Sequence, residues 1–105
     1  MPTNFMIRDE FTEIGDQIER QLRNRGIAVT NSGKLLLMLA MQAQADDHEL
    51  GTNQLRNLVS GIPLDHIADY FKRTYRTDKM DFNRALHLLS DWGVYFKYPW
   101  TPTRA

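Results

Sequence analysis

Five basic side chains lie within a short stretch of the second half of the chain and could bind an anionic polymer. Lys and Arg neutralise backbone phosphates, and Arg can also hydrogen-bond to guanine edges. Tyr70 and Tyr75 lie among these cations. The pattern predicts a contact with nucleic acid, and the candidate residues are Lys72, Arg73, Arg76, Lys79 and Arg84.

Two features favour a simpler interpretation of this basic cluster. Asp65 and Asp69 occupy the early turns of the same predicted helix, where they would repel phosphate. The cations fall in its last turns, where they complement the helix dipole without any ligand. The chain as a whole is uncharged, although residues 50–105 hold eight basic and five acidic side chains. The sequence therefore does not distinguish between a protein that binds DNA, one that binds RNA and one that binds no nucleic acid.

The C-terminal segment carries a second candidate surface, which is aromatic. Trp and Tyr are typical anchors of protein interfaces, and an edge strand can pair with another chain. This segment favours an adaptor, an inhibitor, a small subunit or a homodimer. The alternative is that its rings pack over the core. The candidate protein-interface residues are Tyr95, Phe96, Tyr98 and Trp100.

The usual catalytic and metal-binding patterns are missing from the sequence. There is no cysteine, no Gly-rich phosphate loop and no His-Glu-x-x-His motif. His66 and Asp69 share one helix face, but such pairs are common on ordinary helix surfaces. We therefore expect no catalytic residue, no metal, no cofactor and no small-molecule substrate.

The hydrophobic spacing predicts an all-α fold of about five helices. In the first, apolar residues recur at helical steps and Gly26 is placed to end the helix. The expected helices span residues 7–25, 33–45, 53–60, 64–76 and from 78 or 81 to 92. The second is apolar on nearly all sides, which is typical of a buried central helix, and Asn31 or Ser32 is its expected cap.

The chain ends in a helix, a glycine and an expected strand over residues 94–98. The run Leu88-Leu89-Ser90-Asp91-Trp92-Gly93-Val94 resembles the exit of a winged-helix domain, and Ser60-Gly61-Ile62-Pro63 has the length of a helix-turn-helix turn. That resemblance implies a helix-turn-helix-like or partial winged-helix domain that binds nucleic acid as a dimer. The chain departs from the winged-helix pattern in two ways. An extra helix, residues 64–76, precedes the candidate recognition helix, which in this alternative is residues 81–92. Only seven residues follow Tyr98, which is too few for a normal wing.

Length and composition predict one helical domain over residues 1–105, with a frayed tail at 101–105. The longest apolar run, Leu35–Met41, is too short to span a membrane. The N-terminus lacks the apolar core of a signal peptide. We therefore expect a cytoplasmic protein. Small cysteine-free helical proteins of this kind are also associated with phages and mobile elements.

Overall fold

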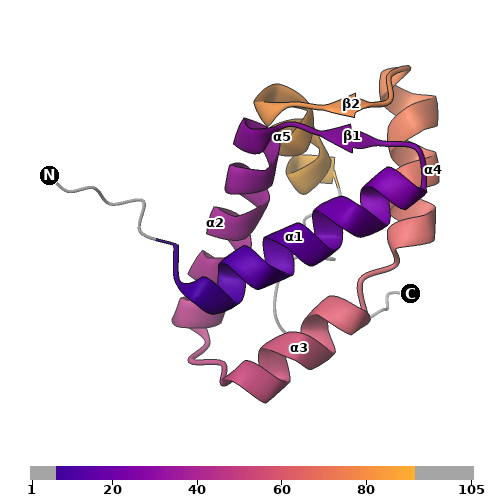
Figure 1. The fold of residues 1–105 in the computed structure, drawn as a ribbon. Coiled ribbons are helices and arrows are strands. Elements are labelled where there is room, and N and C mark those ends of the chain that lie inside the picture. The colour runs from indigo at the N-terminus through magenta and orange to yellow at the C-terminus, as the bar shows by residue number, and fades with distance from the viewer. Residues whose placement is uncertain (1–6, 92–105) are drawn as a thin grey trace, which may run out of the picture.

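The computed structural model of the protein describes residues 7–91, in which five helices surround a core and one small sheet joins two connections (Figure 1). The predicted mostly helical fold is confirmed. In chain order the elements are α1 (Asp9–Asn24), β1 (Ala28–Val29), α2 (Asn31–Asp47), α3 (Thr52–Ser60), α4 (Leu64–Tyr75), β2 (Lys79–Met80) and α5 (Phe82–Asp91).

Helix α1 forms where the apolar spacing predicts it, although it begins two residues later than expected. Its buried stripe includes Phe11, Ile18 and Leu22. The left-handed Gly26 (φ 87°) follows the helix, and the N–H of Ile27 donates to the carbonyl of Leu22 at 2.9 Å. This is a Schellman ending, in which Ile27 also packs beside Leu22 in the core. The predicted role of Gly26 is confirmed.

Helix α2 is longer than predicted, and its cap is a different residue. Thr30, rather than Asn31 or Ser32, accepts a hydrogen bond from the N–H of Gly33 through its side-chain oxygen at 3.1 Å. The prediction missed Thr30 because three consecutive residues could all serve as caps. The helix packs mainly against α1 and α5.

The outer side of α2 departs from the expectation of a fully buried central helix. Leu37 and Met41 are buried, whereas Leu35 and Leu39 are partly exposed. Neither of these two leucines packs against the main core cluster. The helix is therefore central on one face and open on another, which an all-apolar sequence cannot reveal.

A two-stranded parallel sheet connects the segments that precede α2 and α5. Ala28 pairs with Lys79 and Val29 with Met80. Figure 1 shows the two strands side by side above α1. The sequence did not predict this sheet, because residues 27–29 were interpreted as a link, and residues 77–78 as a break before a helix that starts near Asp78 or Asp81. Strands of two residues are too short to show any alternation.

The core is formed by one apolar face from each helix. Phe11 of α1, Ile67 and Phe71 of α4, and Leu88 of α5 are almost fully buried, and Met80 of β2 is buried with them. No helix within residues 7–91 is long and apolar enough to cross a membrane.

Helix α5 starts after Asp81, whose carboxylate accepts a hydrogen bond from the N–H of Arg84 at 2.9 Å. This agrees with the later of the two predicted starts. The predicted last residue of this helix, Trp92, and its glycine stop lie outside the described residues. So do the expected strand at 94–98 and the expected frayed tail at 101–105.

Candidate nucleic-acid interface

The five predicted basic residues come from three elements that follow one another in the chain. Three of them belong to the last turn of α4 and its cap, one to β2 and one to α5. We call this set the basic edge, and its members are Lys72, Arg73, Arg76, Lys79 and Arg84. The chain connection between α4 and α5 passes through β2.

Two members of the basic edge already make contacts inside the protein. The Lys72 ammonium donates to the backbone carbonyl of Arg25 at 2.7 Å, so it caps the carboxyl end of α1. The Arg73 guanidinium forms an ion pair with Asp69, one turn earlier on α4, at 3.0 Å. Both side chains therefore have partners inside the protein, although Lys72 binds the end of α1 rather than the end of its own helix.

Two other members, Arg76 and Lys79, are exposed. Arg76 caps α4 in the left-handed conformation (φ 57°), and Lys79 starts β2. Within residues 7–91, no side chain pairs with either cation. These two positive charges are therefore available to an external anion.

The fifth member, Arg84, connects α5 to the end of α4. Its guanidinium lies over the ring of Tyr75, 5.7 Å from the ring centroid. This cation–π contact is one that sequence spacing could not have shown, because the two residues lie on different helices. It places the first turn of α5 beside the last residue of α4.

A cluster that the sequence did not predict lies at the other end of α5. One carboxylate oxygen of Asp91 accepts hydrogen bonds from the hydroxyls of Tyr70, at 3.0 Å, and Tyr75, at 2.5 Å. These bonds lower the pKa of Asp91, the Tyr75 bond contributing most. Burial, helped by the negative charge of Asp91, raises the pKa of Tyr75 well above its usual range. The two tyrosines thus tie the last described turn of α5 to α4.

The Asp91 cluster predicts a specific sensitivity to acid. Because the folded-state pKa of Asp91 is lowered, its contribution to stability is present above its unfolded pKa, about 3.9, and is lost as the pH falls through the folded value. We therefore expect Asp91→Asn to lose less unfolding free energy than the wild type between about pH 5 and pH 3. Urea unfolding at both pH values measures this difference. Equal losses in the two proteins would contradict it.

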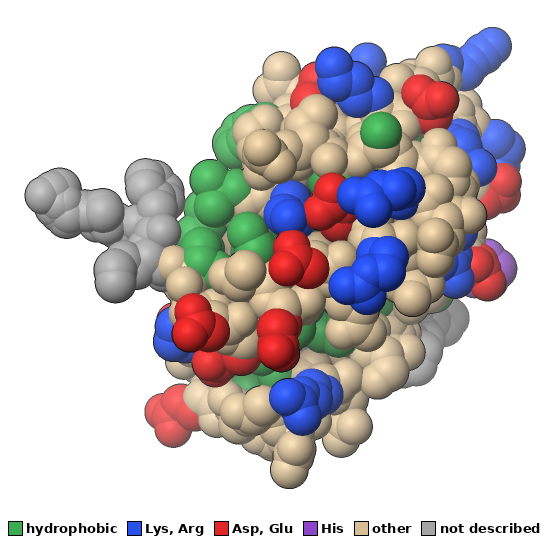
Figure 2. All heavy atoms as spheres, in the orientation of Figure 1, with side chains coloured by type: hydrophobic (Ala, Val, Ile, Leu, Met, Phe, Trp, Pro, Cys, Tyr) green, Lys and Arg blue, Asp and Glu red, His purple; other side chains and the backbone are tan. Residues whose placement is uncertain are grey.

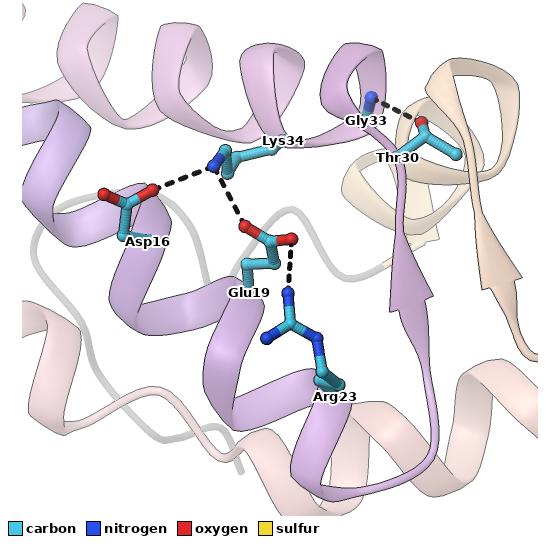
Figure 3. Close-up of polar contacts among 6 residues, drawn as sticks. All are labelled: Asp16, Glu19, Arg23, Thr30, Gly33 and Lys34. Carbon is cyan, nitrogen blue, oxygen red and sulfur yellow. Dashed lines mark hydrogen bonds and ion pairs between the residues drawn. The ribbon is translucent and has the colours of Figure 1, made fainter.

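A separate group of charges joins α1 to α2 (Figure 3). The Lys34 ammonium donates to Asp16 at 2.8 Å and to Glu19 at 2.9 Å, and Glu19 also accepts from Arg23 at 2.7 Å. The pKa of each carboxyl group is lowered, chiefly by its hydrogen bond from Lys34. Two acids and two cations balance each other here, so this group leaves no net charge for a ligand.

A cleft of about 350 Å³ lies between α1 and the junction of α3 with α4, and His66 is part of its wall. The carboxylates that could have assisted His66 are both bound to arginines. Asp65 pairs with Arg25 at 2.5 Å, and Asp69 pairs with Arg73. Among the described residues, no three His, Asp or Glu side chains are grouped so that they could hold a metal ion.

The second predicted surface cannot be placed on the fold. All four candidate protein-interface residues, Tyr95, Phe96, Tyr98 and Trp100, lie outside the described residues.

The described geometry defines a small, mostly helical protein in which a two-stranded parallel sheet links the segments before α2 and α5. No protein-family model, curated protein or solved structure matches this chain.

Proposed function

We propose that this protein is a non-enzymatic, helix-turn-helix-like factor that contacts nucleic acid through the basic edge. The observation that carries the proposal is the pair Arg76 and Lys79, two exposed cations on one connection with no partner among the described side chains. Arg84 adds a third positive charge beside the end of α4. Phosphates of a nucleic-acid backbone are the natural ligands of such a group.

The acidic residues of α4 should repel the phosphates of a nucleic acid less strongly than their formal charges suggest. Asp65 is paired with Arg25 and Asp69 with Arg73, so part of their negative charge is neutralised. Helices α3 and α4 are joined by residues 61–63, a length that suits a helix-turn-helix. Sequence-independent contacts with phosphates fit this arrangement better than reading of base edges by the early turns of α4.

The proposal predicts a salt-dependent affinity that depends on two residues. Replacing both Arg76 and Lys79 by Ala is expected to weaken binding to duplex DNA or RNA by about tenfold at low salt. The slope of log K against log salt should also fall by about 2, because two phosphate contacts are lost. Fluorescence anisotropy with labelled duplexes over a salt series measures both quantities.

Arg20 and Arg56 offer a matched control, since both are exposed cations outside the basic edge. Replacing both by Ala removes the same charge and should leave the salt slope unchanged. If the wild-type protein binds neither duplex at about 50 mM salt, the proposal fails.

A second candidate function is contact with another protein, and an observation on the described residues favours it. Phe82 and Leu86 are large hydrophobic side chains of α5 that remain 45% and 48% exposed. Figure 2 shows further hydrophobic side chains gathered where Figure 1 places α2. Exposed apolar surface of this kind marks interaction sites.

A further inference from the structure

The Asp91 cluster brings three oxygen atoms from two helices to one point. Its members are Tyr70 and Tyr75 of α4 and Asp91 of α5. One carboxylate oxygen of Asp91 accepts both phenol hydroxyls, at 3.0 Å and 2.5 Å, and the two hydroxyls also interact with each other. Two phenol oxygens and one carboxylate oxygen therefore form a small triangle.

The spacing of these oxygens is that of neighbouring ligands around a small metal ion. Small hard cations bind oxygen ligands octahedrally at about 2.0–2.1 Å, which places neighbouring ligands about 2.8–3.0 Å apart. The two contacts at Asp91, 2.5 Å and 3.0 Å, lie on either side of most of this range. A cation that replaces the two phenol protons would therefore require only small movements of the three side chains.

Charge balance selects the kind of cation. Once ionised, two phenols and one carboxyl group carry three negative charges, which a trivalent cation neutralises. The pKa of Tyr75 is raised well above its usual range, so a weak Lewis acid would leave this phenol protonated at neutral pH. A ferric ion is a strong Lewis acid, and the charge of a bound metal favours the deprotonated form of its ligands.

His87 is placed to add a nitrogen ligand. It lies one turn before Asp91 on the same face of α5, and its charge contributes to the lowered pKa of that carboxyl group. Its ring centroid is 6.1 Å from that of Tyr75. Imidazole is a common ligand of iron. Asp91 is exposed, so water has access to the remaining coordination positions.

The fold already holds the ring of Tyr75 in place. This ring packs edge-on against the buried Phe71, with 5.1 Å between the ring centroids, and it meets the ring of Tyr70 at a right angle. The guanidinium of Arg84 lies 5.7 Å from the same ring centroid. It repels a cation, but three ionised ligands outweigh its single charge, and it favours the phenolate form of Tyr75.

We propose that Tyr70, Tyr75 and Asp91 form a binding site for a ferric ion, with His87 as a fourth ligand. On binding, the O–H bonds of the two phenols break, two iron–oxygen bonds form and both protons pass to the solvent. The oxidation state of the iron does not change. None of the four ligands belongs to the basic edge, so this site does not depend on the proposed contact with nucleic acid.

The first experiment adds Fe³⁺ to the full chain as its nitrilotriacetate chelate and records the visible spectrum. A phenolate–iron charge-transfer band is expected, and it should saturate at one iron per chain. Tyr70→Phe and Tyr75→Phe should each weaken iron binding by about 100-fold or more, because the loss of an outer-shell partner alone costs about 10–100-fold. Both variants keep the aromatic ring and remove only the ligand oxygen.

A matched control removes the two other phenols of the chain. The double variant Tyr95→Phe, Tyr98→Phe loses as many hydroxyls as the site contains and should keep the band at full strength. Absence of the band in the wild type at equimolar iron would overturn the proposal. A band of equal strength in Tyr70→Phe and Tyr75→Phe would overturn it as well.

The second experiment measures thermal unfolding by circular dichroism, which also shows that each variant is folded. Fe³⁺ should raise the unfolding midpoint of the wild type but not that of Tyr75→Phe, because a ligand that binds only the folded state stabilises it. Ga³⁺ has the same charge and is not reduced under these conditions, so it should give a similar rise. An equal rise in Tyr75→Phe would show that the ion binds elsewhere, and the proposed site would be wrong.

Discussion

Replacing Phe71 by alanine is expected to lower the free energy of unfolding by about 3–5 kcal/mol, which is a large share of the stability of a domain this size. Phe71 is 0% exposed and belongs to the main core cluster. Its ring also packs edge-on against Tyr75, with 5.1 Å between the ring centroids. Tyr75 in turn holds Asp91 and Arg84 of α5, so the loss at Phe71 should spread from α4 to α5. Urea unfolding followed by circular dichroism measures the change.

Phe82→Ala is the matched control, because it removes the same ring from an exposed position. Phe82 is 45% exposed, so its replacement should change the stability of the monomer by about 0.5 kcal/mol or less. A loss at Phe82 as large as that at Phe71 would show that the ring of Phe82 belongs to the core.

The helices could be predicted from the sequence because their apolar residues repeat at helical steps over several turns. The stripe Phe11, Ile18 and Leu22 is an example, and each of these side chains is buried. The sheet could not be predicted in this way, since its pairing of Val29 with Met80 joins residues far apart in the chain. The sequence predicted that α2 is a helix, but it did not predict that one side of this helix is exposed. A helix with apolar residues on all sides gives no sign of which side the rest of the fold leaves uncovered.

The residues of the candidate site could be predicted from the sequence, but the contacts that each of them makes could not. The sequence shows where the cations are, but it cannot show that Lys72 binds the end of α1 while Arg76 and Lys79 stay exposed. It also gave no signal for the two hydrogen bonds at Asp91, which depend on how α4 and α5 pack. Which cations remain for a ligand is therefore decided by tertiary contacts rather than by the sequence pattern.

The close approach of α2 to β2 predicts that Gly33→Ala destabilises the protein. A Cβ atom at Gly33 would lie 2.5 Å from the carbonyl oxygen of Met80, and this oxygen belongs to the backbone of β2. It cannot move aside as a side chain can, so β2 or the start of α2 must shift. Overpacking of this kind costs up to about 3 kcal/mol, and the better helix propensity of alanine returns about 1 kcal/mol. The expected net loss of unfolding free energy is up to about 2 kcal/mol.

Two other glycines separate this steric effect from helix propensity. Gly51 lies just before α3, and the nearest atom to an added Cβ is 3.7 Å away, so Gly51→Ala should cost only the loss of a weak helix cap, about 1 kcal/mol or less. At Gly15 the added Cβ meets the side chain of Met38 at 2.5 Å, and a methionine side chain can adapt. Gly15→Ala should therefore cost less than Gly33→Ala in urea unfolding. If Gly33→Ala were as stable as the wild type, the close contact between α2 and β2 would have to be wrong.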